Sequence, residues 1–213
     1  MRIFDVLHSH ENYAKGCDVS QYQGNIDWEV VGKVQDSFQL DFVFIRATAG
    51  RNVKDRRFNR NWKRSKRSNL VRGAYHYYRP NENSLRQAEN FINTVTLEKG
   101  DLPPVLDIEA LPRVQSIDSL KLGLKRWLER VENHYGIKPI IYTSSSFYNN
   151  YLYNDFEQYI CWIANYNFYV ETMDRDWHFW QFTEEAILLG IREKVDLNIY
   201  NGTVEQLKQL VMK

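Results

Sequence analysis

Eight short apolar segments, rich in β-branched and aromatic residues, recur along the 213-residue chain and limit its possible folds more than any other feature. Several, such as Phe42–Ile45 and Pro139–Tyr142, are continuous apolar runs without polar alternation. Strands buried on both faces of a helix-covered parallel sheet have this pattern. We therefore predict eight strands, near Gly16–Ser20, Phe42–Thr48, Arg72–Tyr78, Pro104–Glu109, Lys138–Thr143, Tyr159–Ala164, His178–Phe182 and Val195–Ile199.

Amphipathic segments of helical periodicity lie mainly between the early strands. The predicted helices are Asp27–Ser37, Arg56–Ser68, Asn83–Thr96, Ser116–Tyr135 and Thr203–Met212, with Ser116 and Thr203 as N-caps. Only about a dozen residues separate the sixth strand from the seventh and the seventh from the eighth, too few for a crossover helix and its loops. The pattern predicts an α/β fold, an irregular (β/α) TIM-like barrel of eight strands with helices missing in its second half.

Composition restricts the function classes. The apolar fraction is 43%, the charged fraction 26% and the net charge +1, which argues against whole-chain disorder and predicts neither a nucleic-acid binder nor a membrane-surface protein. No apolar run approaches the roughly 20 residues that span a bilayer. We expect a monomer with an N-terminal extension over residues 1–15 and one domain over 16–213. The first sixteen residues hold no continuous apolar run, so we expect no intact secretion signal in this chain.

Three further features of the sequence need no role in catalysis or binding to explain them. Cys17 and Cys161 lie in strand-like apolar runs and are expected to be buried free thiols. We expect no metal site at His8 and His10, which lie near a polar terminus. The aromatic segment 147–156 fits either a packed loop or a flap over a ligand, and the sequence does not decide between them.

Polar and aromatic residues gather where the predicted strands end. In a (β/α) barrel the active site lies at the carboxyl ends of the strands, so these residues should share one mouth. Four carboxylates would stand at three of the ends, an arrangement that costs stability through repulsion and therefore suggests a function. The residues are Asp18, Arg46 with Thr48, His76 with Tyr77, Asp107 with Glu109, Tyr142 with Ser144, Asn165 with Tyr166, Trp180 with Gln181, and Asp196 with Asn198.

Asp107 and Glu109 form the central pair. Residues i and i+2 of a strand point to the same face with their Cα atoms roughly 6–7 Å apart, so each carboxyl should perturb the pKa of the other. Glycosidases need two carboxyls, one of which protonates the leaving oxygen. Asp27-Trp28-Glu29 has the same D-x-E form, but we interpret it as a helix N-terminus. A D-x-E tripeptide alone does not decide whether its acids are catalytic. The buried strand that precedes Asp107 favours a catalytic role for Asp107 and Glu109.

The whole region from Gly16 to Asn201 resembles glycoside hydrolase family 25, the Chalaropsis-type lysozymes. The similarity rests on a series of ordered blocks. These blocks are Gly16–Ser20 with Gln23-Gly24, Phe44–Gly50, Asp55 with Phe58 and Asn61, Gly73–Tyr77, Pro104–Glu109, Pro139–Thr143, Trp162–Ala164 with Tyr166, Trp180–Phe182 and Val195–Asn198.

The resemblance implies hydrolysis of the β-1,4 bond between N-acetylmuramic acid and N-acetylglucosamine in peptidoglycan, without a metal or other cofactor. It implies an extracytoplasmic or secreted enzyme. Glu109 would be the general acid and then the base, and Asp107 would stabilise the 2-acetamido group of the substrate. Asp18 and Asp196 complete the predicted catalytic set. The predicted substrate-binding residues are Arg46, His76, Tyr77, Tyr142, Trp162, Tyr166, Trp180 and Gln181.

One block departs from the family pattern, which is usually similar to Lys-Ala-Thr-Glu-Gly. Here the chain has Arg46 and Ala49, so a charge is kept with a different geometry and a polar group is lost from the rim of the site. Two alternatives therefore stay open: a catalytically weak peptidoglycan-binding barrel, and a hydrolase of another amino-sugar polymer. The ten Lys and Arg residues of 51–72 favour a solvated helix face over a surface that attracts anionic wall polymers.

Overall fold

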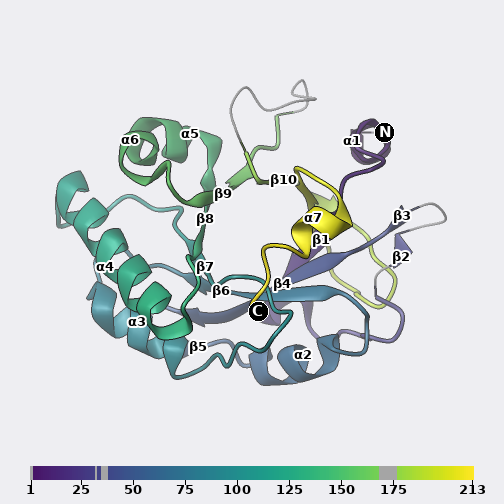
Figure 1. Ribbon diagram of the computed structural model, residues 1–213, viewed down its shortest axis with the longest axis horizontal. Helices are drawn as coiled ribbons and strands as arrows, with labels where there is room; N and C mark the ends of the chain where they lie inside the picture. The colour runs from purple at the N-terminus through teal and green to yellow at the C-terminus, as the bar shows by residue number, and fades with distance from the viewer. Residues whose placement is uncertain (1, 32, 35–37, 168–176) are drawn as a thin grey trace.

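The computed structural model describes residues 2–31, 33–34, 38–167 and 177–213. Within these residues, eight strands close into a barrel with helices along one side (Figure 1), which confirms the predicted fold class. The barrel strands are β1 (Lys15–Val19), β4 (Phe42–Ala49), β6 (Val71–Tyr77), β7 (Val105–Asp107), β8 (Ile140–Ser144), β9 (Ile160–Ala164), β10 (Phe179–Ala186) and β11 (Val195–Tyr200).

The direction of the last strand decides which residues reach the mouth. The barrel strands β4, β6, β7, β8, β9 and β10 pair in parallel in that order, and β1 closes the barrel by pairing in parallel with β4. The short strand β5 (Val53–Lys54) pairs antiparallel with the end of β4, outside the barrel order. Strand β11 runs antiparallel to both β1 and β10. The prediction placed Asp196 at the carboxyl end of its strand, but Asp196 is the second residue of β11. It reaches the same mouth because the strand is reversed, and it lies in register with Asp18.

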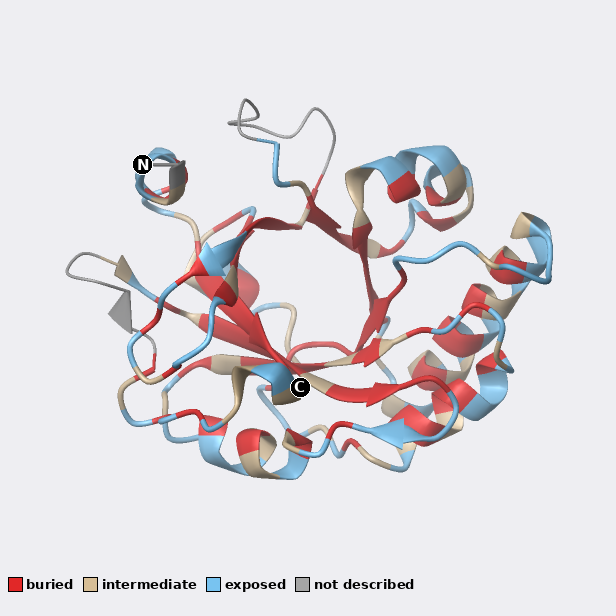
Figure 2. Ribbon diagram, turned by 180° about the vertical axis from the view of Figure 1, so that it is seen from behind, coloured by how far each residue is buried: buried red, intermediate tan, exposed pale blue. Residues whose placement is uncertain are grey.

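Helices cover the half of the barrel from β4 to β8. They are α2 (Phe58–Ser65), α3 (Ser84–Ile92) and α4 (Ile117–Tyr135), each within or near its predicted range. The side chain of Ser116 caps α4, as predicted, by accepting a hydrogen bond from the amide of Ser119. The helix buries a stripe that includes Leu120, Leu124 and Leu128, and its opposite face is exposed (Figure 2).

The predicted helix Asp27–Ser37 is wrong. Turns occupy residues 28–31, and the short strand β2 (Lys33–Val34) pairs with β3 (Phe38–Gln39); residues 32 and 35–37 lie outside the described residues. Three β-branched valines in 30–34 weaken the helical propensity of this segment. The described part of the connection from β1 to β4 therefore contains no α-helix. The connection 187–194 between β10 and β11 also contains no helix, as predicted.

One predicted helix is shorter than its range suggested, and one helical segment was not predicted. The C-terminal helix α7 (Val204–Leu207) covers only part of 203–212, with Thr203 as its N-cap. Between β8 and β9 the chain forms α5 (Ser145–Phe147), a π-helical turn (Tyr148–Leu152) and α6 (Tyr153–Phe156). The segment 147–156 is a packed loop, because four of its apolar side chains are buried: Phe147, Tyr148, Leu152 and Phe156.

Aromatic rings fill the barrel beneath its mouth. Phe44 stacks on Trp162 with ring centroids 4.6 Å apart, and Phe42 meets Phe179 edge to face at 5.4 Å. Glycines in two strands make room for these rings. A Cβ on Gly16 would lie 2.3 Å from the Phe42 ring, and one on Gly73 would lie 2.5 Å from the Phe44 ring. The barrel is therefore a packed core with a site above it.

The N-terminal segment packs against the barrel. Helix α1 (Arg2–Ser9) buries Val6 and Leu7, and the ammonium of Lys15 at the start of β1 donates to three backbone carbonyls of residues 10, 11 and 13. Both cysteines are buried and free, as predicted. Among the described residues, no helix is long and apolar enough to cross a membrane.

The basic segment 51–72 is partly neutralised. Arg72 is buried and forms a bidentate ion pair with Asp101, with N–O distances of 2.7 and 3.1 Å. Lys66 pairs with Glu98, and Arg67 lies 3.6 Å from Glu29. These pairs and the exposure of most other cations favour the solvated helix face.

Candidate active site

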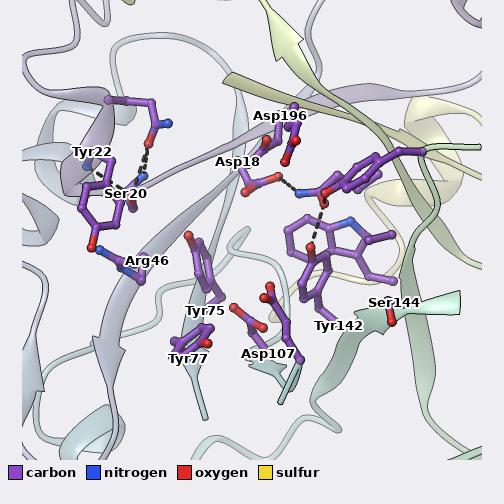
Figure 3. A pocket seen from close by; sticks show the side chains of 17 residues that line it. Asp18, Ser20, Tyr22, Arg46, Tyr75, Tyr77, Asp107, Tyr142, Ser144 and Asp196 are labelled. Atoms are coloured by element: carbon purple, nitrogen blue, oxygen red, sulfur yellow. Dashed lines mark hydrogen bonds between the residues drawn. The ribbon is translucent and has the colours of Figure 1, made fainter. Parts of the chain in front are cut away.

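A cavity of about 480 Å³ opens at the mouth of the barrel. Figure 3 shows acidic side chains facing each other across it between tyrosine-lined walls. The inward positions of neighbouring strands supply these side chains, since alternate residues of a strand face the same side. Eleven residues predicted from the sequence line this cavity: Asp18, Arg46, Tyr77, Asp107, Glu109, Tyr142, Ser144, Trp162, Tyr166, Gln181 and Asp196.

His76 and Trp180 do not line the cavity, which corrects their assignment to the substrate-binding set. Each sits in a strand between two residues that face inward, so its own side chain faces outward. His76 is fully buried, lies 2.7 Å from the Thr48 hydroxyl and stacks on Trp127. Burial lowers the pKa of His76 to about 3, so the ring is neutral. Trp180 is also fully buried, and its indole donates to the Asn165 carbonyl.

Sequence reasoning missed several lining residues, of which Tyr75 matters most. It is inward-facing like Tyr77, two residues later on β6, and the alternation of a strand could have revealed it. Burial raises the pKa of Tyr75 well above its usual value, and the charge of Asp18 raises it further. The other missed lining residues are Ser20, Tyr22, Gln23, Ala164 and Glu184.

Asp18 and Asp196 form one acidic pair on neighbouring strands. Asp18 is almost completely buried, and one of its oxygens accepts hydrogen bonds from the amides of Gln181 at 2.8 Å and Asn198 at 2.9 Å. Burial raises the pKa of Asp18, while these amides oppose the increase. Burial also raises the pKa of Asp196, and the charge of Asp18 adds to this effect. The pair therefore keeps one proton, held by Asp196.

Asp107 and Glu109 form the second pair. Asp107 ends β7 between Tyr77 and Tyr142 of the adjacent strands and is buried, whereas Glu109 stands two residues further, exposed at the mouth. Burial and the charge of Glu109 raise the pKa of Asp107 well above its usual value. Desolvation in the mouth and the charge of Asp18 raise the pKa of Glu109, and a hydrogen bond from Asp107 opposes this. Burial and the neighbouring charges thus favour a proton on this pair of carboxyls.

Arg46 forms the opposite wall. Its guanidinium pairs with Asp55 at 3.0 Å and lies over the Tyr22 ring, 4.8 Å from the centroid. Ala49, at the position that departs from the family pattern, lies in register with Tyr77 but is buried and does not line the cavity. In the described part of the chain, no group of three or more His, Cys, Asp or Glu side chains could hold a metal ion.

Comparisons with known proteins agree with this geometry. The model of the family "Glycosyl hydrolases family 25" matches residues 17–191. YegX of Escherichia coli K12, an uncharacterized protein, is 42% identical over 200 residues, covering 92% of this chain and 72% of YegX. Lysozyme M1 of Streptomyces globisporus is 31% identical over 211 residues, covering 92% of this chain and 70% of that protein.

A solved structure gives the same result for the fold. A family 25 glycosyl hydrolase from Bacillus anthracis superposes with a TM-score of 0.84 at 31% sequence identity, with 95% of each chain covered. The family match spans most of the residues that carry the cavity. The chain therefore belongs to glycosyl hydrolase family 25 and is a glycoside hydrolase of the lysozyme type.

Proposed function

We propose that the protein is an extracytoplasmic muramidase that hydrolyses the β-1,4 bond between N-acetylmuramic acid and N-acetylglucosamine of peptidoglycan. The lysozymes among its relatives support a peptidoglycan substrate. The observation that carries the proposal is the Asp107–Glu109 pair, which opens on a cavity with aromatic walls. Aromatic faces suit the apolar faces of pyranose rings.

Glu109 supplies the proton in this proposal. Desolvation and the charge of Asp18 favour its protonated form, and its position at the mouth lets it reach a glycosidic oxygen. The proton passes from Glu109 to the leaving oxygen as the bond between that oxygen and the sugar C1 breaks. The Glu109 carboxylate then takes a proton from the water that attacks C1.

Asp107 acts on the 2-acetamido group of the sugar. Its Oδ1 is buried without a hydrogen-bond partner among the described residues, an arrangement that an incoming N–H would satisfy. That N–H stabilises the ionised form of Asp107 and so leaves the shared proton on Glu109. The acetamido oxygen attacks C1 as the leaving oxygen departs, and the carboxylate of Asp107 stabilises the positive charge that develops. When the water deprotonated by Glu109 attacks C1, the bond between C1 and the acetamido oxygen breaks and its electron pair returns to the acetamido group.

The test compares Glu109→Gln with Glu29→Gln, a control in the other D-x-E tripeptide. Glu29 is exposed and does not belong to the cavity lining. Loss of general acid–base help costs about 10²–10⁴-fold, so Glu109→Gln should lose at least that in peptidoglycan solubilisation, while binding to insoluble peptidoglycan and Glu29→Gln activity persist. A Glu109→Gln protein that keeps most of its activity would contradict the proposed mechanism.

Product analysis tests the bond. A muramidase leaves N-acetylmuramic acid at the new reducing ends. Reducing ends of N-acetylglucosamine, or cleavage of chitin with intact peptidoglycan, would assign a different amino-sugar bond. Binding of peptidoglycan by the wild type without any new reducing ends would assign a binding barrel.

A further inference from the structure

Behind the acids lies a chain of hydrogen bonds that the proposed mechanism does not use. The indole nitrogen of Trp162 donates to the Asn198 carbonyl oxygen at 2.8 Å. An indole can only donate, so the orientation of the Asn198 amide is fixed, with its oxygen toward Trp162. Its NH₂ group therefore faces Oδ2 of Asp18, 2.9 Å away.

A second amide converges on the same oxygen. Gln181 donates to Asp18 Oδ2 at 2.8 Å, and its own carbonyl oxygen accepts from the hydroxyl of Tyr142 at 2.7 Å and from that of Tyr166. Two N–H donors occupy the lone pairs of Asp18 Oδ2, which leaves no place for a proton on it. Hydrogen bonds of this kind favour the charged form of a buried carboxyl.

We infer that Asn198, oriented by Trp162, is a positioning residue that keeps the negative charge of the acidic pair on Asp18 and the proton on Asp196. The inference rests on the proposed function, because its consequence is for Glu109. A negative charge on Asp18 favours the protonated form of Glu109, which the general acid requires. Asn198 thus acts on the reaction through Asp18 and does not itself line the cavity.

The other ionisable groups around Asp18 do not obscure this effect. They come from the same and neighbouring strands and loops: Cys17, Asp196, Glu184, Asp107, Glu109, Tyr75, Tyr142, Tyr166 and Arg46. The tyrosines and the buried Cys17 thiol stay neutral and Arg46 stays charged between about pH 4 and 9. Only carboxyls change charge in that range, and Glu109 is the carboxyl whose proton the proposed reaction transfers, so we assign the alkaline limb of the pH–rate profile to Glu109.

The test measures that limb in Asn198→Leu, a variant of similar size without the amide. Charge then leaves Asp18 for Asp196, the pKa of Glu109 falls, and the limb moves to lower pH by about one unit. Trp162→Phe keeps a ring against Phe44 but loses the donor, so its limb should move the same way by a smaller amount. The control is Thr143→Val, which removes a fully buried hydroxyl on β8 that is not part of the cavity lining and should leave the limb in place.

The outcomes separate this inference from the proposed function. A rate lowered equally at every pH, or a limb moved to higher pH, would show that Asn198 only packs and would overturn the inference. If Asn198→Leu does not fold, the limb of Trp162→Phe decides in the same way. Full activity of Glu109→Gln would refute the proposed function itself, whereas an inactive Glu109→Gln with an unmoved limb in Asn198→Leu refutes only the role of Asn198.

Discussion

Removing the guanidinium of Arg72 should destabilise the fold more than removing any exposed cation of the basic segment. Arg72 is 4% exposed and holds Asp101, itself 7% exposed, through two short N–O contacts. It also donates to the Trp62 carbonyl and lies over the Trp62 ring at 3.9 Å. Arg72→Met keeps the apolar stem but leaves the buried Asp101 carboxylate with the Glu98 amide as its one remaining hydrogen-bond donor among the described residues.

Breaking a buried ion pair on one side costs about 3–5 kcal/mol. An unfolding entropy of about 2.1 cal/mol/K per residue gives about 0.45 kcal/mol per degree for a chain of this length. The thermal midpoint of Arg72→Met should therefore fall by about 7–11 °C in a circular-dichroism melt. Arg67→Met is the matched control, since its ion pair is exposed and 3.6 Å long, and it should change the midpoint by no more than about 2 °C. Equal midpoints for the two variants would refute the reasoning.

Other predictions concern the barrel and its mouth. Gly73→Ala places a Cβ 2.5 Å from the Phe44 ring and should cost about 1–3 kcal/mol in denaturant unfolding; a neutral result would show that the ring has room to move. His76→Gln should leave the pH–rate profile unchanged, because the wild-type ring is neutral above its pKa of about 3. The folded pKa of His76 lies below that of the unfolded chain, so its stabilisation is complete above about pH 6.5 and is lost as the pH falls. The stability of His76→Gln should thus fall less steeply than that of wild type in acid titrations of the unfolding midpoint. Asp18→Asn should move the alkaline limb to lower pH, because the charge that raises the pKa of Glu109 is gone; a limb moved upward would contradict that assignment.

The sequence predicts the barrel well because its strands are long apolar runs with few alternatives. The helix that failed, 27–37, shows the limit of this approach. Its acids suggested a helix N-terminus, but the backbone amide of Asp27 instead donates to the Gly190 carbonyl and Trp28 is buried in a turn. Contacts between segments far apart in the sequence decided that structure, and local propensity could not reveal them.

The errors at the site have a simpler origin. The prediction took adjacent residues such as Tyr77 and His76 from the end of one strand, although only one of two neighbours can face the barrel interior. Applying the alternation strictly would have excluded His76 and Trp180 and included Tyr75. The pKa of Glu109 was beyond this reasoning, because the sequence suggested Asp107 as the charge that raises it and the structure assigns that effect to Asp18.

The reversed direction of β11 links the acid at the mouth to the amide beneath it. In a parallel strand, Asp196 would lie near the bottom of the barrel and Asn198 nearer the mouth. In the antiparallel strand, Asp196 meets Asp18 at the mouth, and alternation places Asn198 one inward position deeper, beside Trp162. The same reversal therefore supplies the proton-holding partner of Asp18 and the donor that keeps Asp18 charged. The sequence places both residues two positions apart, but only the strand direction determines which of them lines the cavity.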